Sequence, residues 1–262
     1  MFKFESLDAL KHQQLRVMPC QLMDRKNQVH LIDIFPAEIA LLAQELPLFF
    51  NKDSETGQFN LITLMGLTID ENLLIENSQW CGRYLPLKFQ AQPFYLLPAE
   101  LEQSSPQENK QDSTLMNIVI DRADDRVQEL SGEKLFNDGV PSEYLKNRIK
   151  ILKQITEGYT ELDSLTAFYL ENELIEPLTL DITLNNKQKL SITGLYTIHR
   201  ALLTEKIEQQ DKSMPDSVFQ QTQLNSLANQ TRAYLNMAKH ILDSQVHVKR
   251  LIELKNKLCE VS

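Results

Sequence analysis

Apolar and polar residues alternate most regularly between residues 178 and 193. Apolar side chains take every second position on both sides of Asn185-Asn186-Lys187. Such alternation is typical of a strand with one buried face, and asparagine favours turns because its side chain hydrogen-bonds to nearby backbone. The pattern therefore predicts a β-hairpin over 178–193.

The rest of the second half has apolar residues at intervals of three and four, which is typical of amphipathic helices. One helix is expected to begin after Ser142, a residue suited to capping a helix N-terminus, and to end at Gly158. Thr160 would cap the next helix. Further helices are expected over about 199–210, 216–241 and 245–258, with Ser244 separating the last two.

Shorter apolar segments in the first half predict strands over 15–22, 29–34, 59–67 and 116–120, with 73–75 pairing with 59–67. A helix is expected to begin at Pro36 and to end at Pro47, because the residue before a proline disfavours helical backbone. The irregular block 80–97 contains two prolines, which exclude a long helix there.

These elements predict an α+β fold, with a mainly antiparallel sheet, helices packed on it and a helical C-terminal region. The strands are not interleaved one by one with helices, which argues against a doubly wound parallel sheet. We expect a core domain over 1–198 and a helical region over 199–262 packed on the same core. The polar segment 100–114 has no periodicity and is expected to form an exposed loop.

Composition and charge narrow the function classes. The 262 residues carry a formal net charge of −9, so binding to a nucleic-acid phosphate backbone is not expected. We expect neither a signal peptide nor a transmembrane segment, since no apolar run approaches the roughly 20 residues that cross a membrane. The three cysteines are far apart and offer no disulfide framework, which fits a cytoplasmic protein.

No motif of established chemistry can be assembled from the sequence. The seven glycines form no phosphate-binding loop, and the five histidines lack metal-ligand spacing. Asp121, Asp124 and Asp125 could bind a divalent cation, or they could form a solvated loop balanced by Arg122 and Arg126. We therefore assign no catalytic residue, no metal site and no cofactor.

Candidate binding residues gather in the aromatic block. They are Trp80, Arg83, Tyr84, Pro86, Pro93 and Phe94. Aromatic and arginine side chains make good recognition sites because they bury a large area and keep a polar group. The alternative, which the pattern favours, is that the same residues hold an irregular segment in place by packing. The C-terminal stretch 239–257 has five bases and two acids, which would give a helix a mildly basic outer face. That face could meet an acidic partner or this chain's own acidic loop, but a plain solvated face is favoured.

Short motifs along nearly the whole chain resemble the SapC family. They include Leu46-Pro47-Leu48-Phe49-Phe50, Trp80 with Tyr84-Leu85-Pro86, Pro93-Phe94, Ile120-Asp121, Leu174-Ile175-Glu176-Pro177, Gly194-Leu195-Tyr196-Thr197-Ile198 and Ala238-Lys239-His240-Ile241-Leu242-Asp243-Ser244. One departure is Gln90-Ala91-Gln92, where members of the family usually carry basic residues before the Pro-Phe pair. An anion site there would be lost in this chain.

The resemblance implies a role alongside surface-layer protein transport in bacteria, and an association with flavin-dependent tryptophan-halogenase-like systems. It carries over no catalytic residues. Three hypotheses follow: a non-enzymatic accessory that binds a protein or peptide, an enzyme or enzyme subunit acting on amino acids or peptides, and a structural assembly component. The enzyme hypothesis would need Arg83, Tyr84, Asp121 or His199 to line a pocket. The oligomeric state is left open.

Overall fold

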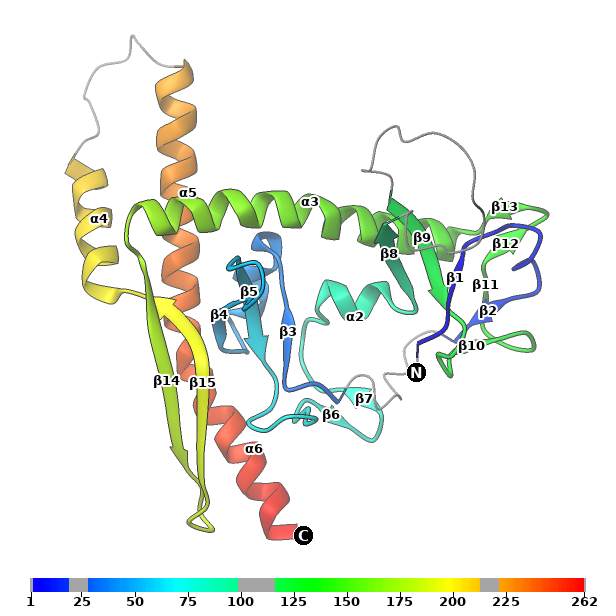
Figure 1. Ribbon diagram of the computed structural model, residues 1–262, viewed down its shortest axis with the longest axis horizontal. Helices are drawn as coiled ribbons and strands as arrows, with labels where there is room; N and C mark the ends of the chain where they lie inside the picture. Colours follow the sequence, from blue (N-terminus) through cyan, green and yellow to red (C-terminus); the bar gives the residue numbers. More distant parts are fainter. Residues whose placement is uncertain (1, 19–27, 99–115, 213–221, 262) are drawn as a thin grey trace. The chain divides into compact units, whose positions relative to one another are not determined.

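The computed structural model describes residues 2–18, 28–98, 116–212 and 222–261 (Figure 1). The elements in chain order are β1 (Phe4–Ser6), β2 (Arg16–Val17), β3 (Leu31–Asp33), η2 (Pro36–Glu38), α1 (Ile39–Leu42), β4 (Leu48–Lys52), β5 (Phe59–Leu64), β6 (Ile75–Glu76), β7 (Gln79–Trp80), α2 (Leu87–Ala91), β8 (Phe94–Pro98), β9 (Met116–Asp121), β10 (Val127–Gln128), β11 (Glu133–Lys134), β12 (Phe136–Asn137), β13 (Val140–Pro141), α3 (Glu143–Glu171), β14 (Ile175–Thr183), β15 (Lys189–Ile198), α4 (Arg200–Lys212), α5 (Thr222–Ser244), η4 (Gln245–His247) and α6 (Val248–Val261).

The described strands pair antiparallel throughout, and the fold is α+β as the sequence predicts. The chain divides into two compact units. Unit 1 comprises residues 1–27, 75–80 and 87–156, and unit 2 comprises residues 28–74, 81–86 and 157–262. The domain arrangement expected from the sequence, a core over 1–198 and a helical region over 199–262, stays a prediction. The described helices of 199–262 belong to the same unit as the largest sheet.

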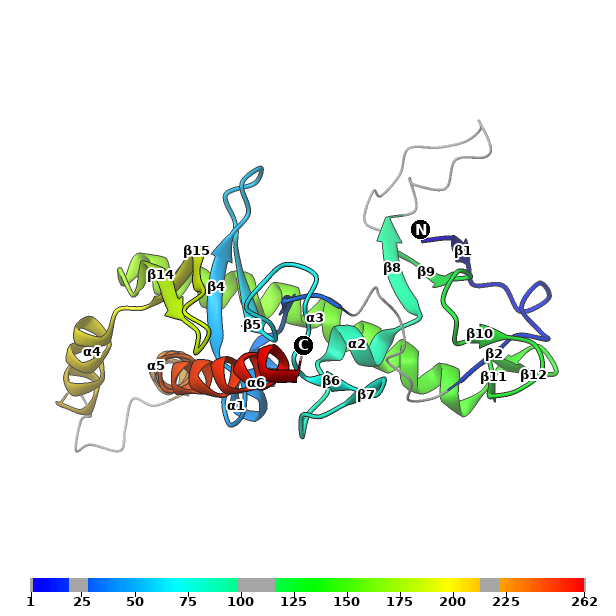
Figure 2. The same ribbon diagram turned by 90° about the horizontal axis from the view of Figure 1, so that it is seen from below.

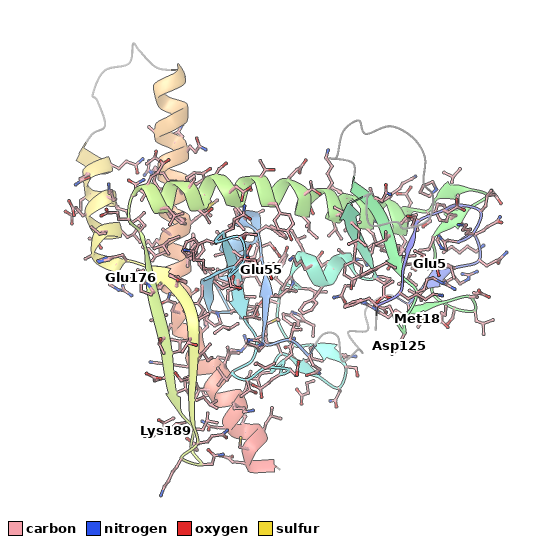
Figure 3. All side chains as sticks on the ribbon, in the orientation of Figure 1. Glu5, Met18, Glu55, Asp125, Glu176 and Lys189 are labelled. Atoms are coloured by element: carbon pink, nitrogen blue, oxygen red, sulfur yellow. The ribbon has the colours of Figure 1, made fainter. Side chains whose placement is uncertain are left out.

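Unit 2 contains a five-stranded sheet in the order β14-β15-β4-β5-β3. The predicted hairpin is confirmed and is longer than expected, since β14 pairs with β15 from Ile175–Ile198 to Thr183–Lys189. Figure 3 labels Glu176 near one end of this hairpin and Lys189 near the other. Tyr196 of β15 then pairs with Phe50 of β4, which joins the hairpin to strands from the first half of the chain.

The core of unit 2 lies where α3, α5 and the sheet meet. The ring of Tyr169 on α3 is fully buried and contacts Phe50, with ring centroids 6.0 Å apart. Its hydroxyl donates a 2.8 Å hydrogen bond to the carbonyl oxygen of Tyr234 on α5. Burial raises the pKa of Tyr169 far above its usual value, so the hydroxyl keeps its proton and acts as a structural donor.

The prediction that a helix ends at Gly158 is wrong. Residues 143–171 form one continuous helix of 29 residues, and Thr160 lies inside it. A Cβ atom on Gly158 would lie 2.7 Å from ring atoms of the buried Phe35. The glycine is therefore required for close packing against that ring rather than for ending the helix. Ser142 does cap the N-terminus, accepting a hydrogen bond from the Leu145 N–H.

The first half differs from the sequence prediction in several elements. Strands β4 and β8 are not among the predicted elements, and the helix from Pro36 is short, ending at Leu42. Residues 73–75 do not add a strand beside β5, because β6 pairs with β7 instead. Of the strand expected over 15–22, the described part holds only β2. Residues 19–22 and the expected loop 100–114 lie outside the described residues.

Unit 1 consists of short strands around the first part of α3. β1, β9 and β8 form one small sheet, and β2 pairs with both β10 and β11. Phe94 of β8 is buried and lies against Tyr144 of α3, with ring centroids 6.4 Å apart. Figure 3 labels Glu5, Met18 and Asp125 in this unit. The unit also buries an ion pair, in which Arg126 donates to Asp124 at 2.6 Å.

Candidate functional site

The six candidate residues of the aromatic block fall into different parts of the fold. Trp80, Pro93 and Phe94 belong to unit 1, whereas Arg83, Tyr84 and Pro86 belong to unit 2. The six residues are therefore divided between the two compact units. Pro86, Pro93 and Phe94 are buried, while Trp80 and Tyr84 are half-buried and Arg83 is exposed.

Within unit 1, the Trp80 ring packs against a residue of the nearby helix α2. Its ring centroid lies 5.9 Å from that of Phe89, a buried residue of α2. Gln92 lies between α2 and β8. Its side-chain oxygen accepts a 3.0 Å hydrogen bond from Arg126. Arg126 also donates to Asp124 through Nε at 2.8 Å. Burial alone would lower the pKa of Arg126, but the Asp124 carboxylate outweighs it and raises that pKa.

Within unit 2, the carboxylate of Glu45 fixes the segment that carries Arg83 and Tyr84. The backbone N–H of Arg83 donates to both carboxylate oxygens, at 2.9 and 2.8 Å, and that of Tyr84 donates to Oε1 at 2.9 Å. Glu45 is only 6% exposed. Hydrogen bonds to an ionised acceptor are stronger than neutral ones, so the backbone at 83–84 is held in one conformation.

The same glutamate connects to the start of α6. Arg250 Nη1 lies 3.7 Å from Glu45 Oε2 and donates a 3.3 Å hydrogen bond to the Glu45 carbonyl oxygen. His247 Nε2 lies 3.1 Å from the carbonyl oxygen of Ala43, close to the end of α1. Figure 2 shows α1 beside α5 and α6. We call Ala43, Glu45, Arg83, Tyr84, His247 and Arg250 the Glu45 junction, since they join three distant segments of unit 2.

Exposed apolar and basic side chains border the Glu45 junction. Leu41 of α1 is 48% exposed and Val246 of η4 is 58% exposed. They come from the two elements that the His247–Ala43 contact connects. Lys249 is exposed, and the Arg250 side chain is 38% exposed. The junction therefore combines a fixed backbone with apolar and cationic side chains open to solvent.

Two of the five bases in the stretch 239–257 form ion pairs with acids of unit 2. Lys239 pairs with Asp243 at 2.9 Å, and Lys255 donates to Glu71 within unit 2. Arg250 lies 3.7 Å from the buried Glu45 carboxylate, which balances part of its charge. Lys249 and Lys257 are exposed on α6, and the acid Glu253 is exposed between them.

The residues that an enzyme would need are engaged in local structure. Asp121 is fully buried, and its Oδ1 accepts hydrogen bonds from the backbone N–H groups of Lys3 and Ala123. His199 Nδ1 accepts from the Leu202 N–H at 3.3 Å, at the start of α4. Of the carboxylates considered for a cation, Asp124 is paired with Arg126. In the described residues no three histidine, cysteine or acidic side chains form a metal-binding group.

Sequence reasoning did not identify Glu45 and Arg250 as functional candidates. Glu45 lies 38 residues before Arg83 and 205 residues before Arg250 in the sequence. No local pattern reveals contacts over such separations. One signal was present: Glu45 directly precedes Leu46-Pro47-Leu48, and a buried acid needs hydrogen-bond partners. Among the helices of the described ranges, none combines the length and apolar character that crossing a membrane requires.

Comparison with known proteins gives one match. A family model described as SapC matches residues 7–251. No curated protein and no solved structure matches the chain.

Proposed function

The chain belongs to the SapC family, and from that premise we propose that it is a non-enzymatic accessory that binds a protein or peptide. Its role would lie in surface-protein transport or in the modification of peptides. The binding surface would be the one around the Glu45 junction in unit 2.

The observation that carries this proposal is the combination of a rigid backbone and an exposed arginine at Arg83. Three backbone hydrogen bonds to Glu45 fix residues 83–84, while the Arg83 side chain remains open to solvent. A partner that binds here orders little of the backbone, which lowers the entropic cost of association. Arginine is among the residues that contribute most to protein interfaces.

The other candidates of the aromatic block would serve the site differently. Trp80 is half-buried and offers a second contact surface, in unit 1. Pro86, Pro93 and Phe94 are buried and would act by holding the shape of their segments rather than by touching a partner. We prefer an accessory to an enzyme because Asp121 and His199 serve as acceptors for backbone N–H groups.

A pull-down from the lysate of the source organism tests the proposal. The tagged wild-type protein is compared with Arg83→Ala and with Arg232→Ala, a matched control that removes an exposed arginine from α5 of the same unit. We expect a partner recovered in near-equal amount with the wild type and the control, and reduced at least tenfold with Arg83→Ala. Circular dichroism checks that all three chains are folded.

Equal recovery of the partner by Arg83→Ala and the wild type would contradict the proposal, and so would the absence of any partner. Glu45→Gln adds a further readout. The amide retains one acceptor oxygen, so the segment 81–86 should exchange its backbone amides faster and the partner should bind more weakly. Hydrogen exchange followed by mass spectrometry measures the first effect independently of the second.

A further inference from the structure

We infer that the surface at the Glu45 junction receives an acidic peptide segment that also carries an apolar side chain. This inference rests on the proposed function and names the chemistry of its partner. It follows from how the charges of the junction are divided between its interior and its surface.

At the Glu45 junction the acidic side chain is buried, whereas the basic side chains are exposed or partly exposed. Glu45 is buried and its oxygens are occupied by the N–H groups of Arg83 and Tyr84 and by Arg250. The Arg83 and Lys249 side chains are exposed, and Arg250 is partly exposed. An incoming carboxylate would therefore meet the exposed guanidinium of Arg83 and the exposed ammonium group of Lys249, while Glu45 keeps its contact with Arg250.

Two acids lie in the stretch 239–257, and one of them, Glu253, is exposed on α6 one turn after Lys249. Against it stand the cations of Arg83, Lys249 and Arg250. Asp243, near the end of α5, is engaged by Lys239 at 2.9 Å and so brings its own cation. The chain as a whole has a net charge of −9, and ten acids against four bases lie between residues 100 and 138, in a separate part of the sequence. A basic surface on an acidic protein attracts an acidic segment and repels most other faces of the same chain.

A carboxylate group suits the arginine of this surface. A guanidinium presents parallel N–H donors that match the two oxygens of a carboxylate. Arg83 is attached to a fixed backbone, so a partner has to order its side chain but not its main chain. The adjoining exposed side chains, Leu41 and Val246, offer contact area to an apolar residue beside the acid.

Selection from a displayed library of random 12-residue peptides tests the inference. Wild-type protein should enrich peptides with Asp or Glu close to a large apolar residue. The strongest selected peptide should bind at least tenfold more weakly to Arg83→Glu than to wild type, and should bind Arg232→Glu as well as wild type. Replacing its acids by the matching amides should weaken binding at least tenfold, as measured by fluorescence anisotropy.

Three outcomes would overturn the inference: no enrichment, enrichment of peptides without acids, or equal binding to Arg83→Glu. Preferential binding to anionic lipid vesicles in the same assay would also overturn it. The pull-down separates these failures from failure of the proposed function. A lysate partner that depends on Arg83 while the library yields no acidic peptide leaves the accessory function standing with a different recognition chemistry.

Discussion

The two units of this protein differ in the contacts that stabilise their interiors. Unit 2 has a sheet whose strands reach ten residues, and the side chains of Leu48, Phe49 and Phe50 within it are fully buried. The strands of unit 1 have two to six residues. Unit 1 also buries the Asp124–Arg126 pair and Asp121. Both units bury polar side chains, Glu45 among them in unit 2, but the ion pair of the described residues with both partners buried belongs to unit 1.

We expect the two units to differ in how well they tolerate substitutions. Apolar burial is non-directional, so a large sheet keeps its order while neighbouring apolar side chains change within limits. A buried ion pair depends on both partners, since removing one leaves a charge without compensation. Four predictions test this comparison, ordered by the expected loss of stability.

The largest loss is expected from Phe50→Ala in unit 2. The side chain is fully buried and contacts Tyr169, so its removal should lower the free energy of unfolding by about 3–5 kcal/mol. Urea unfolding followed by circular dichroism measures the change. Phe2→Ala removes a ring of the same size that is half exposed and should cost far less. Similar losses for the two variants would contradict apolar burial as the basis of unit 2.

A smaller loss is expected from Asp124→Asn in unit 1. The substitution leaves the buried Arg126 guanidinium with the Gln92 oxygen but without a carboxylate. We expect about 2–3 kcal/mol of destabilisation and faster amide exchange in the segment 119–128. Adding Arg126→Met should recover part of the loss, because it removes the uncompensated charge. A double variant that is as unstable as the sum of both single variants would show that the pair is not coupled.

Gly158→Ala tests whether close packing against Phe35 outweighs helix propensity within α3. Alanine would normally stabilise a helix by up to about 1 kcal/mol over glycine. Here its methyl group would meet the buried Phe35 ring, so we expect a net destabilisation of about 1–2 kcal/mol. Thermal unfolding of Gly158→Ala with and without Phe35→Leu measures whether the smaller side chain relieves the contact. A rise in stability in the single variant would mean that the ring moves freely.

The smallest effect concerns His30 in unit 2. Burial lowers the pKa of His30 below its ordinary value, against the opposing charges of Asp70 and Glu71. The unfolded chain therefore takes up a proton at this residue at a higher pH than the folded chain. Stability from this group is complete above its unfolded pKa, near 6.5, and falls as the pH drops through 6.5 toward the lowered value.

His30→Gln should remove that component. The difference in unfolding free energy between wild type and His30→Gln should shift by less than about 1 kcal/mol between pH 7.5 and pH 5.5, with wild type losing more. A difference that is constant over this range would show that His30 titrates alike in both states. Urea unfolding at several pH values gives the measurement.

Local patterns predicted the local parts of this fold. The β14–β15 hairpin followed from alternation and from the asparagine turn between its strands, all within 24 residues of sequence. The cap at Ser142 was equally local. β4 was missed because Leu48-Phe49-Phe50 forms an unbroken apolar run, which carries no period to separate a strand from the end of a helix.

Contacts between distant segments set the rest, including the candidate site. Gly158 resembled a helix end because the ring that packs on it belongs to Phe35, far earlier in the chain. Glu45 gave little warning of its role because its partners lie 38, 39 and 205 residues away. The aromatic block was recognised as a unit of sequence, yet its residues divide between the two compact units.

Strand β14 has a consequence for the solubility of the folded chain. It is the terminal strand of its sheet among the described strands, with nine residues whose outer backbone edge could recruit a strand from another molecule. A β-bulge inserts an extra residue into the partner strand β15, opposite Leu178–Leu180, which increases the local twist of the pair, and Asp181 places a charge on β14 itself. Such features hinder edge-to-edge pairing. The sheet can therefore end in an open strand without acting as a template for aggregation.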